Sequence, residues 1–272
     1  MTTAVASVAP NEARAPRLPL SRAELLKLRR RRGLVALLVA MTVLPMVIGF
    51  TVTSILHANN PAKHPSAGGV ENFAGSMEML AVLAGIAAAV VGVTAGAGDR
   101  SAGVFRTLVV TGRSRIRLFA AGIPGGLALV LPFVAVGFGV AVVASIAMAG
   151  PEPQPDAGFV TRMAAWIALQ ASVAFAIGLG AGSLFGSRGM SIGVVLGWLL
   201  AVEPLLAAIS VLGSLRIGLL GASFQRLTPT SPFVESSAPS IAMSAGAAAF
   251  VVALWALVAL IVGAWRTATR DA

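Results

Sequence analysis

The chain has 272 residues, of which 57% are hydrophobic and only 11% charged, whereas soluble domains average about 25% charged residues. This composition excludes a water-soluble globular protein and predicts an all-α protein that crosses a membrane several times. The formal net charge is +10, but the arginines cluster at the ends of apolar runs, so we expect no nucleic-acid partner. Cysteine is absent, which excludes thiolate metal sites and cysteine nucleophiles.

The N-terminal region divides into two parts. Residues 1–20 are rich in alanine and proline, and we expect a disordered cytoplasmic tail without a cleavable signal peptide. Residues 21–272 are expected to form a single transmembrane domain, which opens with an interfacial amphipathic helix over Ser21–Arg32. Its basic side would contact anionic lipid of the inner leaflet, and the alternative is a charge cluster that only stops translocation. The residues of that basic side are Lys27, Arg29, Arg30, Arg31 and Arg32.

Six apolar stretches reach the roughly 20 residues that a membrane-spanning helix needs. The third stretch is long and contains Pro124 and Pro132, so it must tilt, bend at a proline or begin in the interface. The expected spans are about Leu34–Leu56, Ser76–Ala97, Phe119–Ala149, Met163–Phe185, Met190–Leu212 and Ser240–Trp265.

Basic residues are distributed unevenly over the connecting segments. They are frequent before the first span and between the second and third, and sparse in the segments that would lie on the other side. The positive-inside rule therefore predicts a multi-pass protein of the cell membrane with both termini in the cytoplasm. One outer segment, residues 213–239, is half apolar, which fits either a short helix on or within the outer face or an extended loop.

The segment Gly98–Phe119 is a charged stretch between two long apolar runs. Within it, Val104, Phe105 and Leu108 recur at a spacing that places them on one face of a helix. Gly112 then interrupts the pattern. The segment therefore predicts a short helix at the cytoplasmic surface between the second and third spans, placed to contact a partner.

Enzymatic activity is not expected. A phosphate-binding loop needs a lysine followed by serine or threonine, and the only lysines, Lys27 and Lys63, lie outside such a pattern. The only histidines, His57 and His64, lie in the first outer loop, so the HExxH zinc motif and an intramembrane serine–histidine pair are both absent. We expect no metal and no cofactor on this chain.

Two acidic residues interrupt apolar runs. Glu78 lies near the outer start of the second span, and Glu203 lies deeper, beside Pro204. Ionisable side chains at this depth are costly and tend to face protein or a wet cavity. Either residue could line a substrate path or hold a gate. The alternatives are that Glu78 reaches the outer interface and that Glu203 bonds backbone groups freed around a proline kink.

Glycines are spaced four residues apart in several spans, which lets helix backbones approach closely. Such ladders can pack helices within one subunit or form a dimer face. They comprise Gly92 and Gly96, Gly122 and Gly126, Gly178, Gly182 and Gly186, and Gly189, Gly193 and Gly197.

Six spans, a basic helix before the first and a charged helical segment after the second resemble the permease subunit of type-2 ABC transporters, the mostly exporting class. The matching motifs are the run Ser21-Arg-Ala-Glu-Leu-Leu-Lys-Leu-Arg29 and, in the later segment, Asp99, Arg100, Gly103, Leu108, Val109, Ser114, Arg115 and Gly122. Gly112 stands where proline is common in that family, and Ile123 where lysine is common.

This resemblance implies a division of labour. Two permease subunits, alike or different, would pair with two cytoplasmic ABC ATPase subunits that hold ATP and Mg²⁺, and would export a substrate that the sequence does not identify. The segment after the second span would be the coupling helix, with Asp99, Arg100, Val104, Phe105, Arg106 and Leu108 at the ATPase. The alternatives are a non-transport scaffold or immunity-type protein, and an ion-coupled secondary carrier that uses Glu203 and Glu78.

Overall fold

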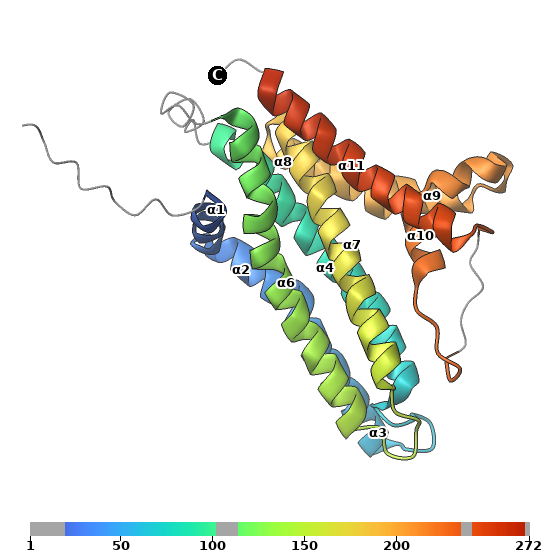
Figure 1. The fold of residues 1–272 in the computed structure, drawn as a ribbon. Coiled ribbons are helices and arrows are strands. Elements are labelled where there is room, and N and C mark those ends of the chain that lie inside the picture. The colour runs from blue at the N-terminus through green and yellow to red at the C-terminus, as the bar shows by residue number, and fades with distance from the viewer. Residues whose placement is uncertain (1–19, 102–113, 235–240, 270–272) are drawn as a thin grey trace, which may run out of the picture.

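The computed structural model describes residues 20–101, 114–234 and 241–269, and only the backbone of residues 99–101. Within these ranges every regular element is helical (Figure 1), which confirms the all-α fold. The expected tail lies almost wholly outside the described residues, as do residues 102–113 of the expected coupling helix. The elements are α1 (Leu20–Arg29), α2 (Arg32–Leu38), the π-helical turn η1 (Val39–Val43), α3 (Leu44–Asn59), α4 (Gly69–Ser101), α6 (Arg115–Ala147), α7 (Ala157–Phe185), α8 (Arg188–Gly197), the π-helical turn η2 (Trp198–Val202), α9 (Glu203–Ala208), the 3₁₀ segment η3 (Ser210–Gly218), α10 (Leu220–Leu227) and α11 (Ala245–Thr269).

Six helices in the described part of the chain are long and apolar enough to cross a membrane, and each matches one expected span. They are Arg32–Asn59, Gly69–Gly98, Arg115–Ala147, Ala157–Phe185, Arg188–Ala208 and Ala245–Thr269. The protein is therefore a multi-pass membrane protein.

The ends of the spans differ from the expected ones for local reasons. The fourth span was expected to begin at Met163 but begins six residues earlier, at Ala157. The Asp156 side chain caps this helix, because it accepts a hydrogen bond from the Phe159 backbone N–H at 2.9 Å. The fifth was expected to continue to Leu212 but ends at Ala208, where the backbone turns at Ile209 into η3.

The basic N-terminal segment forms two helices instead of one. The expected helix over Ser21–Arg32 ends at Arg29, because the backbone of Arg31 is extended and starts α2 in a new direction. The apolar side of α1 packs on α6: Leu28 is fully buried, and Gly125 of α6 leaves no space for a side chain beside Ser21 and Glu24. The apolar side of α1 is thus covered by protein, while Arg29 and Arg30 of the basic side are exposed.

Proline shapes both irregular spans. Pro45 follows η1 and Pro204 follows η2, each at the second residue of the next α-helix. Proline has no N–H to donate to the preceding turn, and a π-helical turn accommodates the missing bond. In α6, by contrast, the helix continues through Pro124 and Pro132 without interruption.

The closest helix pair is α4 with α7. A Cβ on Gly92 would fall on the carbonyl oxygen of Phe175, and one on Gly178 would fall on that of Ala89. Gly96 and Gly182 make the same kind of approach one turn further along. The ladders of α4 and α7 therefore pack helices within the subunit, which is one of the two alternatives that the sequence left open; the other was a dimer face.

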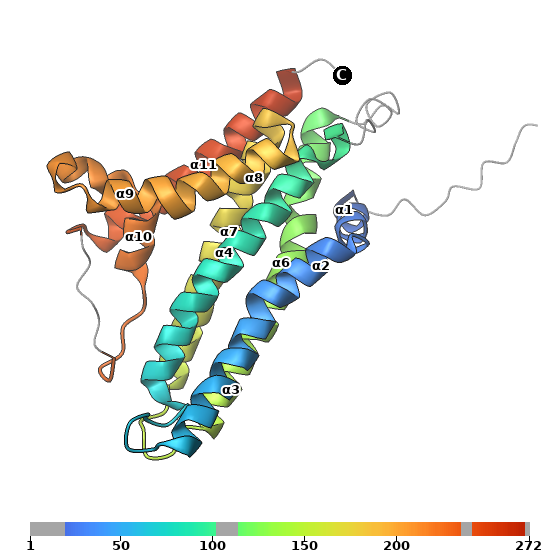
Figure 2. The same cartoon turned by 180° about the vertical axis from the view of Figure 1, so that it is seen from behind.

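The fifth and sixth spans diverge from the other four. In both views α2–α3, α4, α6 and α7 run side by side, whereas α8–α9 and α11 cross at a steep angle (Figures 1 and 2). The ladder of Gly189, Gly193 and Gly197 on α8 is exposed, and a Cβ at each position would meet no group of the described residues within 4 Å. This ladder, unlike that of α4 and α7, is not covered by any helix in the described part of the chain.

The two ends of the bundle differ, and we call them the basic end and the loop end. The basic end carries α1, the start of α6 and the turn between α7 and α8, and the loop end carries the α3–α4 and α6–α7 connections (Figure 2). At the loop end the Gly68 N–H donates to the Met148 carbonyl at 3.0 Å and the Val70 N–H to the Pro153 carbonyl at 2.7 Å, so the two connections hold each other.

The α4–α7 contact predicts a position-dependent effect of alanine. Gly92→Ala should destabilise the protein by about 1–3 kcal/mol, because the new Cβ would force two backbones apart. Gly75→Ala, on the same helix but in open space, should be neutral or slightly stabilising because alanine favours helix. Thermal unfolding of the purified protein in detergent measures both, and equal melting temperatures would contradict the packing argument.

The arrangement of the two ends predicts a labelling pattern. Because the chain has no cysteine, single cysteines can report topology without background. Asn60→Cys, at the loop end, should react with a membrane-impermeant thiol reagent in intact cells. Ser187→Cys, at the basic end, should react only after permeabilisation, and the reverse pattern would overturn the predicted orientation.

Candidate functional site

The residues expected to contact an ATPase lie at the basic end or beyond the described part. Asp99 and Arg100 belong to the last turn of α4, and their side chains are outside the described residues. Val104, Phe105, Arg106 and Leu108 fall in residues 102–113, which are also outside. Their role in coupling remains a prediction. The described flanks are the end of α4 and the start of α6.

Basic side chains from separate segments meet beside the end of α4. A Cβ on Gly98 would lie 3.5 Å from Nη2 of Arg31 and 3.6 Å from Nη2 of Arg188. Within the described residues, the Nη1 atom of Arg31 is buried without a hydrogen-bond partner. The elbow between α1 and α2, the turn before α8 and the end of α4 are therefore in contact at one place.

The remaining basic residues of the N-terminal segment differ in their surroundings. Lys27 forms an ion pair with Glu24 at 2.5 Å on α1. Arg29, Arg30 and Arg32 are exposed. These three side chains are placed to meet lipid headgroups, and that contact remains a prediction.

Glu78 and Glu203, the two acidic residues within spans, have opposite environments. Glu78 is exposed on α4. Glu203 is only 5% exposed, and its Oε1 accepts a hydrogen bond from the backbone N–H of Gly221 at 2.5 Å. The Leu220 N–H is a second donor to the same carboxylate. Glu203 thus bonds the first turn of α10 rather than backbone freed around Pro204.

This first turn of α10 lies near mid-depth of the bundle. The indole Nε1 of Trp166 on α7 donates to the Phe224 carbonyl of α10 at 3.2 Å. Leu220 and Phe224 pack with Val173 of α7 and Val252 of α11. The segment 213–239 was expected to be either a loop or a helix on or within the outer face. Its helical part, α10, packs beside the middle of the fourth span.

A cavity of about 190 Å³ lies beside Glu203, between α4, α7, η2 and α10. Gln170 lines it from α7, thirteen residues after Ala157 and fifteen before Phe185, which is the middle of the span. Its Oε1 atom is buried and has no hydrogen-bond partner among the described residues. Val82 and Leu200, each about half exposed, also line the cavity, so it opens toward the outer surface of the bundle.

A second cavity of about 230 Å³ adjoins the first, and the two share Leu199 and Leu220. Its lining is apolar apart from two indoles, Trp198 and Trp255, whose ring centroids are 5.8 Å apart. The Nε1 atom of Trp255 donates to the Gly218 carbonyl at 3.0 Å. The Nε1 atom of Trp198 is buried, and no acceptor for it is found in the residues that the structure describes.

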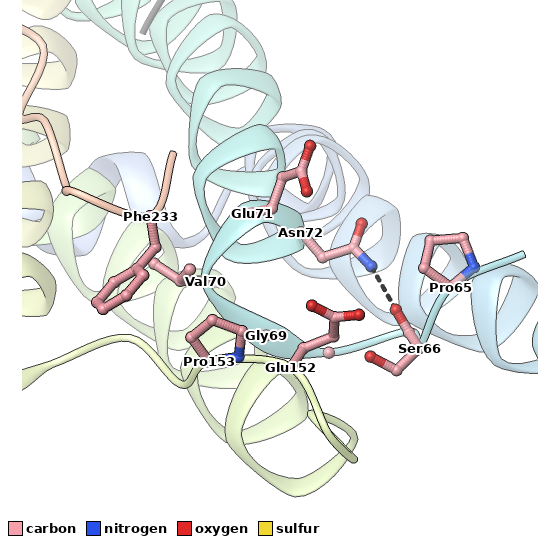
Figure 3. A pocket seen from close by; sticks show the side chains of 10 residues that line it. Pro65, Ser66, Gly69, Val70, Glu71, Asn72, Glu152, Pro153 and Phe233 are labelled. Atoms are coloured by element: carbon pink, nitrogen blue, oxygen red, sulfur yellow. Dashed lines mark hydrogen bonds between the residues drawn. The ribbon is translucent and has the colours of Figure 1, made fainter. Parts of the chain in front are cut away.

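A third cavity, of about 240 Å³, lies at the loop end (Figure 3). Glu71 of α4 and Glu152 of the α6–α7 connection border it, and Asn72 Nδ2 donates to the Ser66 carbonyl at 3.0 Å. Both carboxylates are exposed. No group of three potential metal-ligating side chains occurs among the described residues. The cavity lies where the α3–α4 and α6–α7 connections meet.

Sequence reasoning identified Glu203 and offered a short helix within residues 213–239 as one alternative, but it missed Gln170 and the hydrogen bond between Glu203 and that helix. A signal for Gln170 existed, because it is an amide within an apolar span. A scan against models of known protein families and a search of curated proteins both found no match for this chain.

The contact between Glu203 and α10 predicts a stability difference. Glu203→Leu should destabilise the protein by about 1–3 kcal/mol, because it leaves backbone N–H groups of α10 unpaired at membrane depth. Glu203→Gln keeps an acceptor oxygen and should cost less. Glu78→Leu, at an exposed position, serves as the control and should leave thermal unfolding near the wild type. If Glu203→Leu melts like that control, Glu203 does not stabilise α10.

Proposed function

We propose that this chain is the membrane-spanning permease subunit of an ATP-driven ABC exporter, worked by a separate cytoplasmic ATPase. The observation that carries the proposal is the position of the charged segment between α4 and α6. It follows directly on α4, whose backbone is in contact with that of α7 at four glycines. A displacement applied to this segment would pass into two spans that move as one body.

The basic end supports this proposal further. Arg31 from the elbow and Arg188, the first residue of α8, both approach the end of α4. Movement of α4 would therefore reach the first and fifth spans as well. In the proposed complex, Val104, Phe105 and Leu108 lie in a groove of the ATPase, with Asp99, Arg100 and Arg106 at its rim.

The second permease subunit of the proposed complex has a candidate surface on α8. Gly189, Gly193 and Gly197 form an exposed ladder with no neighbouring group within 4 Å. Small residues at this spacing allow close helix–helix contact in lipid. Pairing through α8 would place the fifth spans of two subunits against each other.

The proposal predicts the effect of a charge at the coupling surface. Phe105→Asp should abolish ATP-driven transport while leaving membrane insertion normal, because it would place a carboxylate in an apolar contact with the ATPase. Phe233→Asp is the matched control, since Phe233 is 64% exposed and borders the cavity at the loop end. Transport into inverted vesicles and co-purification with the ATPase are the measurements. Wild-type transport by the Phe105→Asp variant would exclude the coupling role.

A further inference from the structure

We propose that the Glu203 cavity and the adjoining tryptophan cavity together bind a protonated amine carried on a compact apolar body, which reaches them sideways from the lipid. This inference rests on the proposed function, for which it names the class of substrate. It goes beyond the stabilising role of Glu203, which involves the Gly221 backbone.

The polar groups of the Glu203 cavity call for a hydrogen-bond donor with positive charge. The Glu203 carboxylate accepts from α10, whose first turn offsets about half a unit of charge. Among the described residues no basic side chain pairs with this carboxylate. The buried Oε1 of Gln170 is a further acceptor, and no donor to it lies in the described part of the chain. A protonated amine supplies both the charge and the N–H groups.

Other small occupants fit the cavity less well. An inorganic cation such as Ca²⁺ needs six to eight oxygen ligands, whereas the described lining offers few oxygens among Val82, Ile86, Leu200 and Phe224. Water could bond Gln170 but would leave the charge of the carboxylate only partly compensated in an apolar surrounding. An amine with an apolar body matches both parts of the lining.

The adjoining cavity provides the place for that body. It is lined by two indoles and aliphatic side chains, and it shares Leu199 and Leu220 with the lining of the Glu203 cavity. The two cavities, of about 190 and about 230 Å³, together fall in the lower part of the range for ligand pockets, about 300–1,000 Å³. Their size favours a compact ring system over a long acyl chain.

Access from the lipid follows from the exposed residues at the two openings. Val82 and Leu200 border the Glu203 cavity and Val194 borders the tryptophan cavity, and all three are about half exposed. The spans that carry them expose further large apolar side chains, such as Met79 on α4 and Met190 on α8. A ligand dissolved in the membrane would therefore meet an apolar opening before it meets Glu203.

The test uses the permease alone in lipid nanodiscs, without ATPase or nucleotide, and radiolabelled 1-aminoadamantane as the probe. The wild type should show saturable binding, and 1-adamantanol, which has the same body without the charge, should compete at least about tenfold more weakly. Glu203→Gln should weaken binding of the amine about tenfold or more, and Gln170→Leu should weaken it several-fold. Glu71→Gln removes a carboxylate outside both cavities and should leave the affinity unchanged.

Two results would overturn the inference: unchanged affinity of the amine in Gln170→Leu and Glu203→Gln, or equal competition by the alcohol. Thermal unfolding of each variant shows whether it is folded. If Glu203→Gln does not fold, the binding affinity of Gln170→Leu decides the test. Among the described residues Gln170 forms no hydrogen bond with the first turn of α10, so its loss does not remove the bond that Glu203 makes there. Since no ATPase is present, a failure of binding is distinct from a failure of coupling, which Phe105→Asp tests separately.

Discussion

Backbone amides at the depth of a bilayer must find partners within the protein, and this constraint accounts for the least regular part of the structure. The helix α10 begins near the middle of the fourth span, where its first N–H groups would otherwise be unpaired. The carboxylate of Glu203 accepts from Gly221 and Leu220 there. A charged group that is costly in lipid is thus retained because it satisfies backbone donors that would also be costly.

Proline and the π-helical turn before it position this carboxylate. Pro204 follows Glu203 directly, and η2 lies just before it. The altered helical register turns the end of the fifth span away from the bundle while Glu203 itself stays buried. The same combination of π turn and proline recurs at Pro45 in the first span, so the irregularity follows from the missing N–H rather than from the site.

The helix α4 connects the two regions to which a function is proposed. Its residues Val82 and Ile86 line the cavity beside Glu203, and Asp99 lies in its last turn. At 1.5 Å per residue, Ile86 and Asp99 are about 20 Å apart along the helix. Gly92 and Gly96 hold the intervening turns against α7. On the proposed function, this rigid pair is the physical link between ATPase and substrate.

The sequence by itself determined the class of protein, the six spans and the depth of Glu203, because apolar length and charge placement are local properties that the bilayer imposes. It also identified the glycine ladders, but not which of them would be covered. Tertiary structure decided that α4 and α7 pack through their glycines while α8 stays open. It also decided that Glu203 accepts from α10 and lines one cavity with Gln170, since such arrangements join residues far apart in the chain and depend on how helices cross, which no local pattern encodes.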